Sequence, residues 1–283
     1  MDKVFALLDA TSHSASVCDH AAWAAMRLGL PLSLVHVLDV RLERLAHDAS
    51  DIDFPERAAL CRQIEEAADQ YRKVCLTYGQ LWRAAAVRRA QSAGVQHCEA
   101  SAHPGSLTAA LADVSNSAPL IVTGLHHFQA TADGAAGRDF AQELAIRSVS
   151  SPVLACGDRF ELPVQFMLAY DGLLTASNAL ATVASSALLK NAICHLVMVA
   201  QPSDADTNRL ESARAALEAA GYRVISTVLQ GEPHVALSAY AQLNGIGLLV
   251  MGAYRQARGL TYPVDGTLAN ILRTCPASCL ILN

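Results

Sequence analysis

The sequence predicts an α/β fold built from doubly wound parallel sheets. Two observations carry this prediction: short apolar runs alternate with helical patterns along the chain, and the order of these segments occurs twice. Apolar strands separated by helices form a parallel sheet, because each right-handed crossover lays a helix on one face of it. Strands covered on both faces are apolar throughout, as these runs are.

The two halves begin alike. An apolar run ends at an aspartate in each of them, in "VFALLDA" at Asp9 and in "VQFMLAYDG" at Asp171. A helix pattern of small residues and a second apolar run come next, first at 15–28 and 32–39 and then at 175–189 and 194–200.

The two halves also end alike. Each has a proline-containing turn before a helix, "AHPGSLTAALADV" and "QGEPHVALSAYAQL", and then an apolar run that stops at Gly124 or at Gly252. A helix and a strand close each half, in "FAQELAIRSVSSPVLAC" and "TLANILRTCPASCLIL". Five matched features in one order indicate an internal duplication. We therefore assign residues 1–156 to a first domain, 157–163 to a linker and 164–283 to a second domain.

The halves differ in one insertion. The interval from Asp9 to Gly124 is 34 residues longer than that from Asp171 to Gly252. The added residues hold an apolar stripe that steps by four and three along one predicted long helix: Leu60, Ile64, Ala67, Tyr71, Val74, Tyr78, Leu81 and Ala85. We interpret this stripe as a core-facing surface first and a partner-binding surface second. Residues 53–56 are the expected start of the helix, and a shorter helix at 204–220 takes its place in the second half.

Composition limits the classes of function. The chain has 283 residues, 52% of them apolar and 17% charged, and a net charge of −5. Nucleic acid is not an expected partner, since neutralising phosphates requires clustered lysine and arginine. The sequence shows neither a signal peptide nor a run long enough to cross a membrane, so a cytoplasmic location is expected. Eight cysteines without any C-x-x-C spacing fit the same expectation.

The fold class indicates where a ligand would bind. Doubly wound sheets bind ligands at the carboxyl ends of strands, at the point where the strand order reverses. Asp9, Asp171 and the loops after Gly124 and Gly252 are expected there. The simpler interpretation of both aspartates is a turn or helix-capping residue.

At this stage the halves resemble the universal stress protein (UspA) family, and the chain resembles its tandem, two-domain form. The resemblance rests on "MLAYDG", "LVHVLD", "QGEPHVAL", "LLVMGAYR" and the closing helix and strand, which follow the family's order. It implies five parallel strands in each Rossmann-like domain, of the adenine nucleotide alpha hydrolase-like type. It also implies an intrachain pseudo-dimer, a role in the stress response and, in many members, bound ATP or AMP.

The nucleotide-binding members carry the motif G-x2-G-x9-G-[ST], and neither half has it intact. In the second half Gly252 is followed by Arg255 at the second glycine's place, and the last glycine, Gly266, and Thr267 come one position late. In the first half Gly124 is present and His127 replaces the second glycine. A side chain at these places hinders the approach of backbone N–H groups to a phosphate.

The resemblance implies the following site in the second half, the better candidate. Asp171, with Gly172 after it, would face the adenosine, and backbone near Val197 would meet the adenine edge. Phosphates would lie among Gly252, Arg255, Arg258, Gly266 and Thr267. Asp9 and Gly124 hold the equivalent places in the first half. No metal is expected beyond a nucleotide-bound Mg²⁺.

The sequence is compatible with three functions. The first is a stress protein that binds ATP or AMP and acts by interaction, because no nucleophile elbow, zinc motif or Walker A motif is present. The second is a nucleotide-free scaffold or a binder of a small apolar molecule, since the motif is broken in both halves. A slow ATPase ranks last. The apolar last strands, "SPVLAC" and "SCLIL", are expected to pair between the domains, and a homodimer of two chains is left open.

Overall fold

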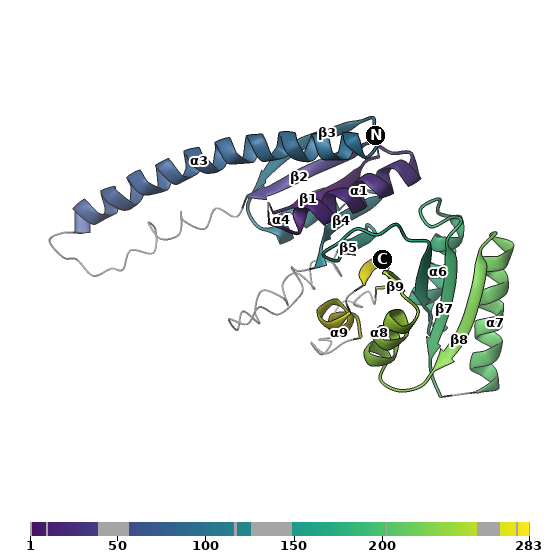
Figure 1. The fold of residues 1–283 in the computed structure, drawn as a ribbon. Helices are drawn as coiled ribbons and strands as arrows, with labels where there is room; N and C mark the ends of the chain where they lie inside the picture. Colours follow the sequence, from purple (N-terminus) through teal and green to yellow (C-terminus); the bar gives the residue numbers. More distant parts are fainter. Residues whose placement is uncertain are drawn as a thin grey trace.

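The two halves share one continuous sheet (Figure 1). The computed structural model describes residues 2–9, 11–38, 57–115, 118–125, 149–201, 203–253, 267–275 and 277–282. Ten strands lie in the order β3-β2-β1-β4-β5-β10-β9-β6-β7-β8. The strands of the first half are β1 (Val4–Leu8), β2 (Leu32–Leu38), β3 (Cys98–Pro104), β4 (Leu120–Gly124) and β5 (Val153–Cys156). Those of the second are β6 (Gln165–Ala169), β7 (Ile193–Val199), β8 (Arg223–Leu229), β9 (Leu248–Gly252) and β10 (Ser278–Leu282).

The strand order confirms the predicted α/β fold with two repeated halves. Within each half every pairing is parallel, and the first strand lies between the second and the fourth. Among the described strands, the one antiparallel pairing joins β5 to β10. Cys279, Leu280 and Ile281 lie opposite Ala155, Leu154 and Val153. The predicted pairing of the last strands is therefore present, and both strands are buried along their whole length.

Helices cover both faces of the sheet, as a doubly wound fold requires. One face carries α1 (Ser14–Leu28), α3 (Arg57–Ser92), α6 (Leu174–Ser185) and α7 (Asp204–Ala219). The opposite face carries α4 (Leu107–Val114), α8 (Pro233–Leu243) and α9 (Thr267–Thr274). Each face has its own apolar core, and both cores run across the junction of the halves. Among the described residues no helix is long and apolar enough to cross a membrane.

Local sequence signals explain several helix ends. Ser106 caps α4 by accepting a hydrogen bond from Ala109 N at 3.2 Å, and Ser203 caps α7 in the same way from Asp206 N at 3.1 Å. Helix α8 starts at Pro233. Proline lacks a backbone N–H, but the N–H groups of a first helical turn have no partner within the helix, so no hydrogen bond is lost. Helix α6 ends at Ser185, earlier than the pattern indicated, because Ser186 is extended and its hydroxyl accepts a bond from Leu188 N.

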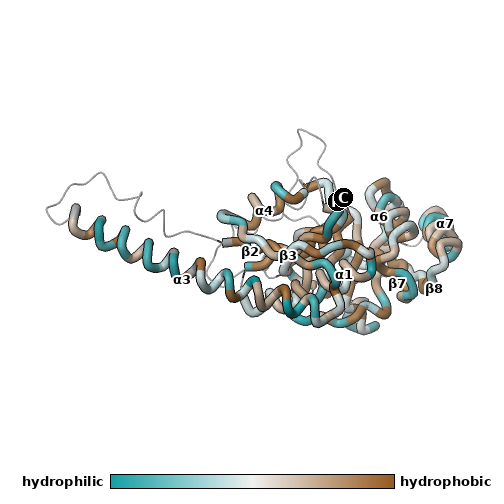
Figure 2. The backbone as a smooth tube through the Cα atoms, turned by 90° about the horizontal axis from the view of Figure 1, so that it is seen from above, coloured by the Kyte–Doolittle hydropathy of each residue, from teal (hydrophilic) through white to brown (hydrophobic). Residues whose placement is uncertain are grey.

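The long helix α3 exists, but its apolar stripe does not face the core, so that interpretation was wrong. The face that packs on the body is formed by Gly79, Trp82, Ala86 and Ala90. Most of the helix extends beyond the edge of the sheet (Figures 1 and 2). The expected helix start at 53–56 lies outside the described residues.

Candidate functional site

The predicted aspartate and glycine of each half lie at the carboxyl ends of neighbouring strands. Asp9 follows β1 and Gly124 ends β4, and these strands pair in parallel. Asp171 and Gly252 stand in the same relation on β6 and β9. In each half the order of strands reverses between these two neighbours. The structure thus brings each pair to the edge where doubly wound folds bind ligands.

In the first half, Asp9 is bonded within its own loop. Its Oδ1 accepts hydrogen bonds from Thr11 N at 3.1 Å, from Thr11 Oγ1 at 2.7 Å and from Ser14 Oγ at 3.0 Å. These contacts fix the turn between β1 and α1. Asp9 therefore has the turn-forming role that the sequence left as its simpler interpretation.

In the second half, Asp171 has a different environment. Its Oδ1 accepts a hydrogen bond from Leu173 N at 2.9 Å, and the side chain is exposed. The positions that correspond to Thr11 and Ser14 are Leu173 and Ala176, which carry no hydroxyl. No side chain caps the first turn of α6 at its N-cap residue, Leu173. A carboxylate has about four acceptor positions, so this turn bond is compatible with further donors.

Two glycines allow close backbone packing and a tight turn at this edge. A Cβ on Gly252 would lie 2.5 Å from the carbonyl oxygen of Thr175, so the end of β9 directly contacts the first turn of α6. Gly172 has φ +75°, in the left-handed region that favours glycine. The fold therefore favours glycine at both positions without any ligand: Gly252 because of the close approach of α6, and Gly172 because of its positive φ.

An arginine that the sequence analysis missed lies beside the same edge. Arg209 of α7 packs over Gly172, where a Cβ would come within 2.9 Å of Arg209 Cδ. Its guanidinium pairs with Asp206 at 3.1 Å on the exposed side of α7. Sequence spacing gave no sign of this contact, because it depends on where α7 lies against the turn after β6.

The remaining predicted site residues are placed as follows. The carbonyl of Val197 accepts a hydrogen bond from Tyr170 N at 2.9 Å, so this acceptor serves the β6–β7 pairing. Gly124 lies opposite Cys156 in the sheet and is buried. Thr267 begins α9. Arg255, Arg258 and Gly266 lie outside the described residues, as does His127.

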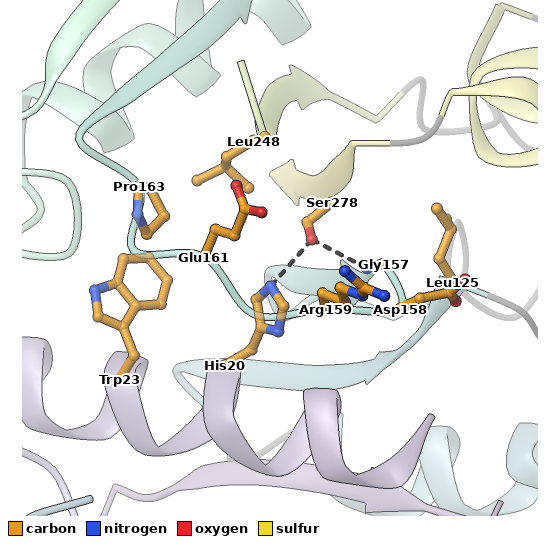
Figure 3. Close-up of a pocket in the computed structure, with 11 residues that line it drawn as sticks. His20, Trp23, Leu125, Gly157, Asp158, Arg159, Glu161, Pro163, Leu248 and Ser278 are labelled. Carbon is orange, nitrogen blue, oxygen red and sulfur yellow. Dashed lines mark hydrogen bonds between the residues drawn. The ribbon is translucent and has the colours of Figure 1, made fainter. Parts of the chain in front are cut away.

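A cavity lies where the halves meet (Figure 3). Its volume is about 430 Å³, within the range of small-molecule sites. The segment 157–163, which the sequence analysis treated only as a linker, forms one wall, and α1, β9 and β10 form the others. The side chains of Trp23, Arg159 and Glu161 line it, and so does Leu125, the residue after Gly124.

A buried histidine organises one wall of this cavity. His20 Nε2 lies 3.1 Å from Ser278 Oγ, and His20 Nδ1 lies 2.8 Å from the carbonyl of Ser16. Ser278 Oγ also accepts a bond from Gly157 N at 3.0 Å. The pattern assigns the proton of a neutral imidazole to Nδ1, with Nε2 accepting from the serine hydroxyl. Burial lowers the pKa of His20, although the Ser16 carbonyl and Asp19 oppose that shift.

Within the part of the chain that the structure describes, no three of the histidine, cysteine, aspartate and glutamate side chains come together as metal ligands. The carboxyl edge of the second half therefore offers hydrogen-bonding groups and the guanidinium of Arg209.

Comparison with known proteins gives a consistent result. The model of the universal stress protein family matches residues 1–155. The universal stress protein Slr1230 of Synechocystis sp. is 27% identical over 280 residues, which cover 96% of each chain. A solved universal stress protein from Archaeoglobus fulgidus matches with a TM-score of 0.68 and 15% identity, covering 99% of this chain and 96% of the other. A Pseudomonas aeruginosa protein of unknown function matches with a TM-score of 0.56 and 14% identity, covering 100% and 92%. The two structural matches bear on the fold alone.

Proposed function

Because this chain belongs to the universal stress protein family, we propose that it is a cytoplasmic stress-response protein that binds ATP or AMP in its second half. The nucleotide lies at the carboxyl edge between β6, β9 and the start of α6. The observation that carries this proposal is the contrast between the two aspartates. Asp9 accepts hydrogen bonds from the hydroxyls of Thr11 and Ser14 in its own loop. Asp171 is exposed, and the two corresponding positions of its loop, Leu173 and Ala176, carry no hydroxyl.

The described residues suit the nucleoside part of such a ligand. A carboxylate accepts hydrogen bonds from the ribose hydroxyls, and the uncapped first turn of α6 offers backbone N–H groups beside it. Arg209 supplies a positive charge over Gly172, at the rim of the same edge. In this proposal the adenine meets the backbone near Val197, using groups other than the carbonyl that Tyr170 engages.

The phosphates are assigned to the region between Gly252 and the start of α9, away from Asp171. Gly252, Arg255, Arg258, Gly266 and Thr267 surround them in this proposal, with the two arginines giving charge-assisted contacts in place of the missing glycine. The start of α9 at Thr267 adds the positive end of a helix dipole. Any Mg²⁺ would arrive with the nucleotide. The protein acts by binding and interaction, and residues 1–156 and 164–283 are the two domains of the pseudo-dimer.

The first experiment asks whether nucleotide is present at all. Freshly purified protein is denatured, and the supernatant is examined for adenine nucleotide by absorbance and mass. Thermal unfolding is then followed with and without ATP or AMP. Ligand at about 1,000 times its dissociation constant stabilises the folded state by about 4 kcal/mol.

The duplication provides a matched control for this experiment. Asp171→Ala should abolish the thermal shift, and Asp9→Ala, the same change in the first half, should keep it. Each variant is compared with its own ligand-free melting temperature. A shift that survives Asp171→Ala but disappears with Asp9→Ala would assign the site to the first half and contradict the proposal.

A second candidate function is binding of a small apolar molecule without nucleotide. It is favoured by an apolar cavity of about 150 Å³ at the junction, between α1, α6 and the start of β4 and β5. Leucine, proline and valine side chains form most of its wall: Leu28, Leu30, Pro119, Leu120, Pro152, Val183, Leu188, Leu189, Leu280 and Leu282. An apolar cavity of about this size holds a molecule such as benzene.

The two candidates are separated by one titration. Stabilisation by benzene or a similar small hydrocarbon, with no shift from ATP or AMP, supports the apolar-ligand function. Phosphate released slowly from ATP, and lost in Asp171→Ala, would instead support a weak ATPase.

A further inference from the structure

Among the residues that the structure describes, helix α3 is anchored to the body near its C-terminal end. Gly79, Ala86 and Ala90 are buried there, and Trp82 packs on the apolar core. The guanidinium of Arg89 binds both carboxylate oxygens of Asp19, at 2.6 and 2.7 Å. The N-terminal part of the helix extends away from the sheet (Figure 1).

The exposed surface of α3 carries a regular apolar repeat, here called the α3 stripe. Its members are separated by four and three residues in strict alternation: Leu60, Ile64, Ala67, Tyr71, Val74, Tyr78, Leu81 and Ala85. The six large side chains among them are 41–69% exposed. Figure 2 shows hydrophilic and hydrophobic residues alternating along this part of the chain.

The α3 stripe is a different face from the one that packs on the sheet. The core-facing residues Gly79, Trp82 and Ala86 each come one position after Tyr78, Leu81 and Ala85. One residue corresponds to a rotation of about 100° on an α-helix. The stripe therefore stays exposed even where the helix is anchored, and the chain's own sheet does not cover it.

A repeat of this kind is characteristic of a coiled coil. Apolar residues with an average spacing of 3.5 keep one face toward a partner helix over successive heptads. The stripe runs from 60 to 85, nearly four heptads. Most helices in proteins draw their stability from the packing of an apolar face, so a partner along this face would also stabilise the helix.

We propose that the α3 stripe pairs with the α3 stripe of a second copy of this chain, as an antiparallel two-stranded coiled coil. The stripe is self-complementary in that direction. With Tyr71 facing Val74 of the other copy, Ala67 faces Tyr78, Ile64 faces Leu81 and Leu60 faces Ala85. Both alanines face large residues, and every member of the stripe has a partner.

A parallel pairing lacks this fit. Each residue would then face its own copy, which puts two Tyr71 side chains in one layer and two Ala67 methyl groups in the next. Overfilled and empty layers are both unfavourable in a packed seam. The difference in volume between layers favours the antiparallel direction.

The charges of α3 are compatible with this pairing. The positions that flank the stripe in a coiled coil hold no charged residue: Cys61, Gln63, Ala68, Gln70, Cys75, Thr77, Trp82 and Ala84. The charged residues between Leu60 and Ala85 all lie at the outer positions of the heptad: Arg62, Glu65, Glu66, Asp69, Arg72, Lys73 and Arg83. No like charges are therefore brought together at the seam.

The test measures the mass of the full chain by sedimentation equilibrium over a range of concentrations. The wild type should sediment at twice the 30.0 kDa of one chain. Ile64→Lys and Leu81→Glu should each raise the dissociation constant of the dimer at least about tenfold. The double variant should restore it, because the antiparallel direction places the introduced lysine opposite the introduced glutamate. In a parallel dimer each introduced charge would face its own copy, and the double variant would be weaker still.

Leu76→Glu is the matched control. Leu76 is 49% exposed on the same helix but is not part of the stripe, so this variant should leave the dimer unchanged. Circular dichroism checks that all variants keep their fold. A wild type that sediments as one chain at every concentration overturns the proposal. It would mean that the α3 stripe is not covered by a second copy, even if another segment or another protein covers it. Dimers that resist Leu81→Glu, or that the double variant fails to restore, overturn it as well.

Discussion

Ser278 Oγ, at the start of β10, lies 3.1 Å from His20 Nε2 on α1. This contact joins the first helix of one half to the last strand of the other. Gly157, the residue after β5, donates to the same serine oxygen, and its carbonyl accepts a hydrogen bond from Ser16 Oγ at 2.7 Å. The junction is thus held by a short polar network as well as by the β5–β10 pairing.

The first prediction is that acid destabilises the protein. Burial lowers the pKa of His20, and burial also lowers the pKa of His36 and of His195. As the pH falls below about 6.5, the unfolded chain binds protons that the folded chain does not yet accept. The contribution of these histidines to the free energy of unfolding is therefore fully present above about pH 6.5 and should be lost as the pH decreases toward the folded-state pKa values. Urea unfolding between about pH 7 and pH 5 measures this slope.

His20→Gln should reduce that slope, since one of the three buried histidines is removed. His97→Gln changes an exposed histidine and provides the control. If the two variants show the same pH dependence as the wild type, His20 does not contribute to the acid sensitivity.

A second prediction concerns the apolar part of the junction. Leu280 of β10 lies opposite Leu154 of β5 and is buried. Leu280→Ala should lower the free energy of unfolding by about 2–5 kcal/mol, because the cavity left behind lies where one of the two apolar cores crosses the junction of the halves. Urea unfolding gives the value, and Leu76→Ala, on the exposed side of α3, should stay within about 0.5 kcal/mol of the wild type.

Much of the fold was predictable because its signals are local. The apolar runs, the aspartate after the first strand and the glycine after the fourth strand all appear twice in the sequence. The pairing of β5 with β10 also followed, since an apolar strand at the edge of a sheet favours a partner. The α3 stripe shows the limit of such reasoning. Periodicity indicated that one face is apolar, but it did not indicate which neighbour covers that face.

The candidate site was predictable to a smaller extent. Asp171 and Gly252 could be assigned to a common edge from the predicted fold class, because both follow or end apolar strands of a doubly wound parallel sheet. The contrast with Asp9 was also present in the sequence, as Thr11 and Ser14 against Leu173 and Ala176, but it required the hydrogen bonds to be noticed. The position of Arg209 over Gly172 and the cavity along 157–163 depend on tertiary packing, for which the sequence has no local signal.

The third prediction tests the contrast between the aspartates by stability. Asp9→Ala removes the acceptor of three hydrogen bonds and leaves the buried hydroxyl of Ser14 without it. This change should lower the free energy of unfolding by about 1–2 kcal/mol. Asp171→Ala, at an exposed position, should lower it by only about 0.5 kcal/mol. Equal losses in urea unfolding would show that the two loops are more alike than their hydrogen bonds indicate.

The last prediction concerns the contact between β9 and α6. Gly252→Ala places a methyl group 2.5 Å from the carbonyl oxygen and 2.7 Å from the carbonyl carbon of Thr175. Both are backbone atoms, so the strand and the helix have to move apart. The free energy of unfolding should fall by about 1–3 kcal/mol, as measured in urea at neutral pH. Gly247→Ala is the matched control, because its added Cβ has no heavy atom within 4 Å among the described residues. It should change stability by no more than about 0.5 kcal/mol. A change equally small in Gly252→Ala would mean that the close approach at Gly252 relaxes without strain.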